Sequence, residues 1–193
     1  MISAGVFLVL TYMVASVPTG PILATLYADV DVTQTGSGNI GATNVYRILG
    51  RRFGAATLVG DVLKGLIPVL LATLVSDKPW FPAVVALVAF GAHCWPAYLE
   101  FRGGKGVATA AGVLFGLAPF VALLTTGVWM LAFLALRRSS VAALMASLSL
   151  WLFTFWLRED LLWVTALLTV GIVQRHRENI QRILQGEEPV TRT

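Results

Sequence analysis

Apolar residues fall into seven runs, separated by shorter polar segments. The runs cover about residues 3–27, 54–75, 81–99, 107–117, 120–136, 141–157 and 161–174. A bilayer core of roughly 30 Å takes about 20 helical residues per crossing, so each run is a candidate span. The pattern predicts an all-α integral membrane protein with about seven transmembrane helices, some of them short or broken.

Two places in the pattern predict interruptions. Residues 107–136 would form one helix of about 45 Å, too long for a simple crossing, and Gly116 and Pro119 offer a turn midway. Pro18 and Pro21 are expected to bend the first span.

Basic residues are distributed unevenly between the alternate sides of these spans. With seven spans only Lys78 and Arg158 lie outside, and the positive-inside rule then places the N-terminus outside and the C-terminus in the cytoplasm. The basic residues on the cytoplasmic side are Arg47, Arg51, Arg52, Arg102, Lys105, Arg137, Arg138, Arg175, Arg177, Arg182 and Arg192.

Composition agrees with this class. The chain is 57% apolar and only 12% charged, and Cys94 is its one cysteine, which excludes an internal disulfide and argues against a zinc site. The net charge of +4 lies in short clusters between spans rather than in a stripe, so no nucleic-acid partner is expected. The first run lacks a preceding basic residue and is interpreted as a retained span. We expect residues 1–193 to form a single transmembrane domain without metal or cofactor.

The longest polar loop reads "DVDVTQTGSGNIGATNVYRILGRR" and has the composition of an anion cradle. Glycine backbone N–H groups can approach a phosphate closely, polar side chains can donate hydrogen bonds, and an arginine supplies a bidentate charge. A helix beginning near Ala42 would add a favourable dipole. The alternative is a Gly/Asn-rich turn with no ligand. The candidates are Gly36, Ser37, Gly38, Asn39, Gly41, Asn44 and Arg47.

A second loop, "EFRGGKGVATAAG", places Arg102 and Lys105 among three glycines. A positive-inside anchor explains the charges but not Gly103, Gly104 and Gly106, which suggest a second close approach of backbone to an anion.

Three further features each have a functional and a structural interpretation. The segment "QRHRENIQRILQGEE" predicts a cytoplasmic helix with His176 and Asn179 on one face, or a basic amphipathic helix lying on anionic lipid. Asp61 and Lys64 share a helical face within a span, where they could mark function or form a structural ion pair. His93 is expected to be a buried histidine bonded to backbone.

Together, the segments "GSGNIGATNVYRILG", "DVLKG", "HCWP", "FRGGKGVATAAG" and "RHRENIQR" resemble the signature set of the PlsY family. These bacterial enzymes acylate glycerol 3-phosphate from acyl phosphate. The resemblance implies seven spans, an active site facing the cytoplasm and a location in the bacterial inner membrane. Thr33 departs from the family pattern, which has an arginine before the glycine loop.

The resemblance also implies a set of site residues and partners. Ser37, Lys105 and His176 would be catalytic, and the partners would be acyl phosphate, glycerol 3-phosphate and membrane lipid. The implied substrate-binding residues are Gly36, Gly38, Asn39, Asn44, Arg47, Gly103, Gly104, Ser140 and Asn179.

The expected reaction is direct acyl transfer to the 1-hydroxyl of glycerol 3-phosphate, which gives lysophosphatidic acid and phosphate and begins bacterial phospholipid synthesis. Positioning and neutralisation of phosphate charge by Lys105 and Arg47 would supply much of the catalysis. His176 could act as a base or only orient substrate. The alternative function is a small anion or phosphate transporter built from the same loops. The sequence does not indicate an oligomeric state.

Overall fold

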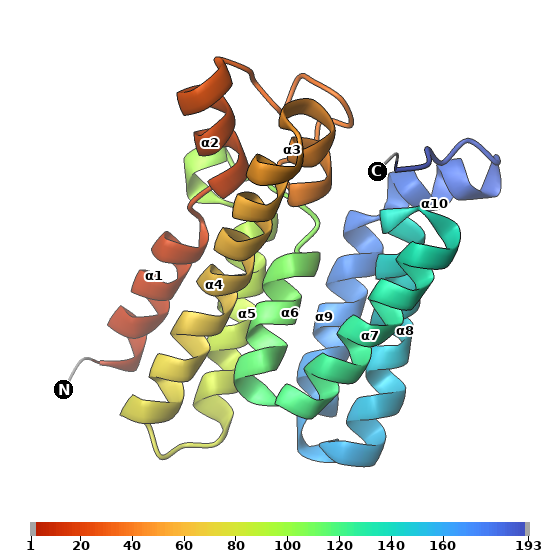
Figure 1. Cartoon of the computed structure of the whole chain (residues 1–193). Coiled ribbons are helices and arrows are strands. Elements are labelled where there is room, and N and C mark those ends of the chain that lie inside the picture. Colours follow the sequence, from red (N-terminus) through yellow and green to blue (C-terminus); the bar gives the residue numbers. More distant parts are fainter. Residues whose placement is uncertain (1–2, 192–193) are drawn as a thin grey trace. The chain divides into compact units, whose positions relative to one another are not determined.

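All seven apolar runs form helices in the computed structural model, which describes residues 3–191 (Figure 1). The described residues contain no strand, so the predicted all-helical class is confirmed. The helices are α1 (Ala4–Ala15), α2 (Thr19–Ala28), α3 (Ala42–Leu49), α4 (Arg51–Val75), α5 (Trp80–Cys94), α6 (Val107–Leu117), α7 (Pro119–Leu136), α8 (Ser139–Leu157), α9 (Leu162–Arg175) and α10 (Arg177–Leu184), with short 3₁₀ turns η1 (Ala97–Leu99) and η2 (Glu159–Leu161).

Both predicted interruptions are present. The first apolar run is broken between α1 and α2 at Pro18, and the run after Val107 ends at Leu117 before a new helix starts at Pro119. Proline causes such breaks because it has no backbone N–H to donate to the preceding turn and its ring displaces that turn's carbonyl. The break at residue 118 therefore makes two helices of a run too long for one crossing.

Membrane insertion follows from the length and surface of the helices. Five helical segments are long and apolar enough to cross a bilayer, and α6 is a shorter apolar helix. Large apolar side chains such as Leu74, Phe120, Leu131 and Trp156 are more than two-thirds exposed, as expected for groups that contact lipid. The exact number of spans and their orientation stay predictions.

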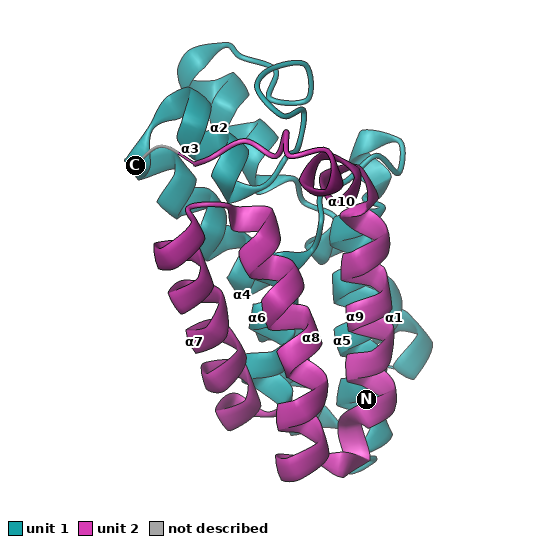
Figure 2. Ribbon diagram, turned by 90° about the vertical axis from the view of Figure 1, so that its right-hand side faces the viewer, with its two compact units in different colours: residues 1–117 teal, residues 118–193 magenta. Residues whose placement is uncertain are grey.

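The described chain divides into two compact units, residues 1–117 and 118–193 (Figure 2). In unit 1, α4 packs against α3, α5 and most extensively α6. A methyl group on Gly112 of α6 would overlap the Val62 carbonyl oxygen of α4, and one on Gly65 would approach the Thr109 carbonyl at 2.5 Å. These glycines let the two helix backbones meet closely, as is common for helices in membranes.

Unit 2 consists of α7, α8, α9 and α10 with the C-terminal tail. Helix α8 packs against both α7 and α9, and the Thr169 hydroxyl of α9 donates a hydrogen bond of 3.0 Å to the Ser147 carbonyl of α8. That bond satisfies a polar group at membrane depth. The assignment of residues 1–193 to a single domain stays a prediction.

Candidate active site

The glycine-rich loop between α2 and α3 is organised around one buried amide. Asn44, in the first turn of α3, is 1% exposed. Its Nδ2 donates to the Val32 and Thr35 carbonyls, each at 3.0 Å, and its Oδ1 accepts from the Ser37 backbone N–H at 2.8 Å. The side chain therefore fixes the path of the loop from within. Because its amide is bonded to the loop backbone, Asn44 would contribute to substrate binding mainly by fixing the shape of this loop.

Two glycines of this loop have conformations that other residues rarely adopt. Gly36 and Gly38 have φ angles of +65° and +68°. A methyl group on Gly36 would also overlap Asn44 Oδ1. Only glycine therefore allows the loop to close over the Asn44 amide.

The predicted phosphate ligands of this loop lie at its surface. Gly36, Ser37 and Gly38 are exposed, Asn39 is half-buried, and Arg47 is exposed in the last turn of α3. Helix α3 begins at Ala42, as expected, with Gly41 at its N-cap. At the loop's start, hydrogen bonds from the Thr33 hydroxyl and backbone N–H hold the pKa of Asp31 below its usual range. The backbone N–H groups of Ser37 and Gly38 donate within the loop, to Asn44 Oδ1 and to the Thr35 carbonyl, so the exposed groups of this surface are chiefly the Ser37 hydroxyl and the Arg47 side chain.

The second predicted loop packs against the end of α5. The Gly104 N–H donates to the His93 carbonyl at 3.1 Å. Methyl groups on Gly103 and Gly104 would overlap the His93 carbonyl oxygen and His93 Nε2, respectively. Both glycines are therefore required by contact with the protein itself. Lys105 follows directly and is half-buried.

In unit 2, a carboxylate joins two of the predicted substrate-binding residues. Glu188 of the C-terminal tail is 7% exposed, and its Oε1 accepts from Ser140 Oγ at 2.5 Å and from Asn179 Nδ2 at 2.7 Å. Its Oε2 accepts from Arg182 Nε at 2.9 Å. Burial raises the pKa of Glu188, but the hydrogen bonds from Ser140, Asn179 and Arg182 outweigh that effect and leave the pKa below its ordinary value.

Ser140 and Asn179, which both donate to Glu188 Oε1, differ in the number of hydrogens they can donate. A serine hydroxyl has one hydrogen, whereas an asparagine amide has two. While Ser140 donates to Glu188 it has no second hydrogen for a phosphate, whereas Asn179 donates one of its two amide hydrogens to the same oxygen.

His176, at the junction of α9 and α10, is 2% exposed. Its Nδ1 lies 2.8 Å from the Ile172 carbonyl oxygen. A carbonyl only accepts, so Nδ1 must carry the hydrogen, and in the neutral ring Nε2 then carries the lone pair. The fold therefore fixes the tautomer that could accept a proton through Nε2.

The sequence interpretation named Ser140 and Asn179 but missed Glu188 and Arg182 as members of the same cluster. The only signal was the acidic pair that ends "RILQGEE" in an otherwise basic segment. Among the described residues no group of three His, Cys, Asp or Glu side chains could hold a metal ion. The roles given to individual site residues stay predictions.

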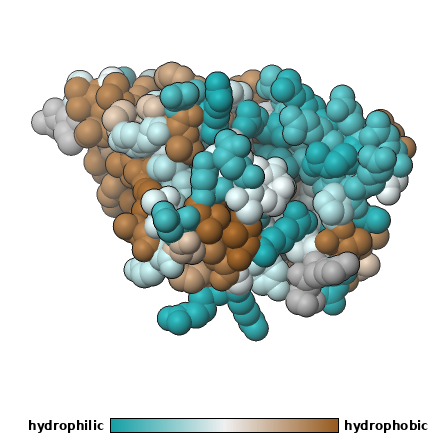
Figure 3. Space-filling model, turned by 90° about the horizontal axis from the view of Figure 1, so that it is seen from above, coloured by the Kyte–Doolittle hydropathy of each residue, from teal (hydrophilic) through white to brown (hydrophobic). Residues whose placement is uncertain are grey.

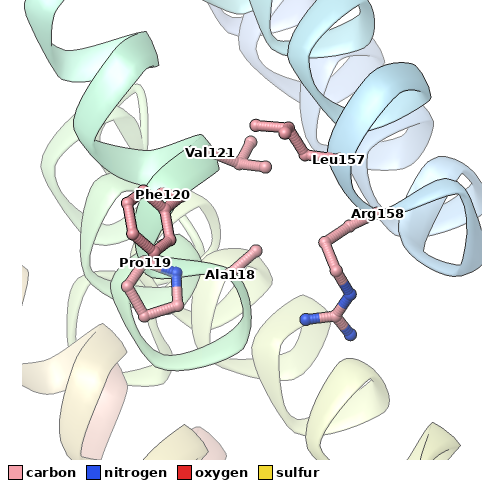
Figure 4. Close-up of a pocket in the computed structure, with 6 residues that line it drawn as sticks. All are labelled: Ala118, Pro119, Phe120, Val121, Leu157 and Arg158. Carbon is pink, nitrogen blue, oxygen red and sulfur yellow. The ribbon is translucent and has the colours of Figure 1, made fainter.

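The surface has two further features. Figure 3 shows both hydrophilic and hydrophobic side chains on the face that is seen from above. A cavity of about 170 Å³ in unit 2 is lined mainly by apolar residues of the α6–α7 junction and the start of α7, with Arg158 from the end of α8 (Figure 4). Ser140 lies at the opposite end of α8, roughly 27 Å away along the helix, so this cavity is not part of the Ser140 cluster.

The long apolar helices, joined by glycine-rich and basic loops, define a polytopic membrane protein. The glycerol-3-phosphate acyltransferase family model matches residues 5–186. The chain belongs to this family of glycerol-3-phosphate acyltransferases.

Relatives match over nearly the whole chain. The glycerol-3-phosphate acyltransferase of Rubrobacter xylanophilus is 45% identical over 93% of this chain and 90% of its own. That of Geotalea daltonii is 41% identical over 98% of both chains.

Two solved structures are similar as well, both crystal structures of PlsY (YgiH), an integral membrane glycerol 3-phosphate acyltransferase. The glycerol 3-phosphate form has a TM-score of 0.92 and 39% identity, covering 98% of this chain and 96% of that one. The lysophosphatidic acid form has a TM-score of 0.90 and 39% identity, covering 98% and 95%. The predicted family is confirmed.

Proposed function

We propose that this protein transfers an acyl group from acyl phosphate to the 1-hydroxyl of glycerol 3-phosphate, giving lysophosphatidic acid and phosphate. The observation that carries the proposal is the near full-length likeness to an acyltransferase with crystal structures in a glycerol 3-phosphate form and a lysophosphatidic acid form. Those two molecules are the acceptor and the acylated product of one reaction. The same likeness favours an acyltransferase over the transporter.

The reaction depends more on the positioning of the two substrates than on a strong nucleophile. The 1-hydroxyl oxygen attacks the acyl carbon, a new C–O bond forms, and the bond from that carbon to the phosphate oxygen breaks. The hydroxyl proton ends on the departing phosphate. Because the phosphate is a good leaving group, holding the two substrates together can supply much of the barrier reduction.

Two cations would neutralise the charge that this reaction concentrates. Lys105, half-buried in its glycine loop, and Arg47, exposed on α3, are suited to phosphate oxygens and to the oxyanion that develops on the acyl carbonyl. The hydroxyl of Ser37, which is exposed on the glycine-rich loop, would add an uncharged donor. No protein carboxylate or acyl-enzyme is needed.

His176 has a geometry that fits either of two roles. With its hydrogen on Nδ1, the ring can accept a proton at Nε2 or can orient a substrate hydroxyl through the same atom. Glutamine can orient a hydroxyl but cannot act as a base at neutral pH. If His176→Gln kept normal turnover, general-base catalysis by this residue would be excluded.

We further propose that the protein lies in the bacterial inner membrane with seven spans, its C-terminus and active site facing the cytoplasm. The asymmetry of basic residues supports this orientation. Protease digestion of the C-terminal tail in oriented vesicles tests it. Cleavage in inside-out vesicles but not in right-side-out vesicles is expected, and the reverse pattern would contradict the orientation.

The reaction is tested by phosphate release from purified protein in lipid vesicles, given palmitoyl phosphate with and without glycerol 3-phosphate. Release should require both substrates and yield lysophosphatidic acid. Lys105→Ala should abolish it, whereas Lys78→Ala, a matched change at an exposed lysine of another loop, should not. A folded protein that forms no product, or a trapped covalent acyl-protein, would refute the proposed direct transfer.

A further inference from the structure

Three ionisable side chains form a buried cluster inside unit 1. Asp61 and Lys64 of α4 and His93 of α5 are 2%, 7% and 3% exposed. Lys64 Nζ lies 2.9 Å from Asp61 Oδ1, and His93 Nδ1 lies 3.7 Å from the same oxygen. Asp61 Oδ1 therefore faces a cation on one side and an imidazole on the other.

Lys64 also joins the cluster to the break between α1 and α2. Its Nζ donates a hydrogen bond of 2.9 Å to the Val17 carbonyl. In a regular helix the N–H of residue 21 would bond this carbonyl, but residue 21 is proline and has no N–H. The Val17 carbonyl accepts instead from the Thr19 N–H at 3.1 Å, and Lys64 supplies its second donor.

His93 joins the cluster to the loop that contains Lys105. Its carbonyl accepts from the Gly104 N–H at 3.1 Å, and its ring lies where a methyl group on Gly104 would be. The next residues are held too, because the Tyr12 hydroxyl donates to the Trp95 carbonyl at 2.6 Å. A continuous series of contacts therefore runs from Val17 through Lys64, Asp61 and His93 to the residue before Lys105.

We propose that Asp61, Lys64 and His93 are positioning residues that fix the loop of residues 102–106 and thereby aim Lys105 at the reacting phosphate. The inference rests on the proposed function, because it gives the cluster a role in that same reaction. On one side the imidazole lies 3.7 Å from Asp61 Oδ1, an electrostatic contact and not a hydrogen bond, and on the other side it packs against Gly104. An error of about 1 Å in placing a catalytic group can cost on the order of 100-fold in rate.

A purely structural ion pair makes a different prediction. Buried ion pairs often contribute little net stability, and replacing both partners by uncharged groups of similar size is frequently neutral. Asp61→Asn combined with Lys64→Met should therefore leave the protein folded. If the cluster aims Lys105, the same double variant should lose turnover.

The experiment compares this double variant and His93→Ala with a control that makes matched changes in the exposed ion pair of unit 2, Arg158→Met with Asp160→Asn. Each protein is assayed for kcat, for both KM values, for its melting temperature and for hydrogen exchange of the Gly104 amide. We expect kcat to fall at least about tenfold with both KM values within threefold. Gly104 exchange should accelerate, while the control matches the unmodified protein.

Normal turnover in either cluster variant, or lost turnover with unchanged Gly104 exchange, would overturn the proposal. If His93→Ala does not fold, His93→Gln and the double variant decide the question. Because exchange at Gly104 is measured without substrate, a failure of the acyltransferase assay in the unmodified protein would remain distinguishable from a failure of the positioning cluster.

Discussion

The C-terminal tail is expected to depend on one carboxylate. Glu188→Ala removes the acceptor of hydrogen bonds from Ser140, Asn179 and Arg182. Ser140 and Asn179 are 7% and 4% exposed, so neither donor readily finds water in place of the lost oxygen.

The cost follows from those three contacts. A buried donor left unsatisfied costs about 1–3 kcal/mol, and two of them cost about 2–6 kcal/mol. The Arg182 side chain is 36% exposed and its ion pair adds little, about 0–1 kcal/mol. Even the lower figure of about 2 kcal/mol raises the population of tails detached from the cluster roughly 30-fold.

Trypsin cleavage at the bond after Arg182 measures this population. The bond lies within α10, and a protease cuts a helix only after local opening, at a rate proportional to the open fraction when reclosing is fast. We expect Glu188→Ala to be cut at least about 30-fold faster than the unmodified protein. Glu187→Ala, a change at the exposed neighbour, is the matched control and should be cut at the normal rate. Equal cleavage of the two variants would refute the reasoning.

Four further predictions follow from the same contacts. Gly104→Ala should lower acyltransferase activity at least about tenfold, because the new methyl group would overlap the His93 ring. The control, Gly91→Ala on an open helix face, should match the unmodified protein in the same assay. Asn44→Asp should lower the melting temperature, because it replaces the two N–H donors of the amide by an acceptor oxygen beside the Val32 and Thr35 carbonyls. The same change at half-buried Asn39 should shift the melting temperature by less than half as much. Because folding lowers the pKa of Glu188, the contribution of this carboxylate to stability is complete above the ordinary glutamate value of 4.5 and is lost as the pH falls through the lower folded value. Hydrogen exchange of residues 186–191, corrected for intrinsic rates, should therefore accelerate in that acidic range. The Glu188→Gln variant should show no such step. Ser140→Ala should change the KM for glycerol 3-phosphate by less than about threefold, because the single hydroxyl hydrogen of Ser140 is donated to Glu188 and is not available to a ligand; a larger rise in KM would argue against this count.

The helices were predictable because their signals are local. Apolar runs of membrane-crossing length and prolines at positions 18 and 119 act on the chain's own backbone, whatever the rest of the fold does. The structure accordingly has breaks at both prolines and a separate α10 after His176. Local signals of this kind do not fix the number of complete crossings.

The glycines of the Lys105 loop show what the sequence could not settle. A glycine beside a lysine predicts that something approaches the backbone closely, and an anion was the expected partner. The structure places His93 against Gly104 instead. The pattern indicates that a side chain is excluded but not which atom excludes it, because that atom belongs to His93, eleven residues earlier in the chain, near the end of α5.

Glu188 was unpredictable for a related reason. Its neighbour Glu187 is the same residue type in the same segment, yet only Glu188 is buried, because the turn after α10 directs one side chain toward Ser140 and the other toward solvent. Gly186, with a φ angle of +75°, makes that turn. The partner residue Ser140 lies 48 positions earlier, so no local pattern distinguishes the two glutamates. The charged C-terminal tail is thus the element that accepts the hydroxyl hydrogen of Ser140 and an amide hydrogen of Asn179.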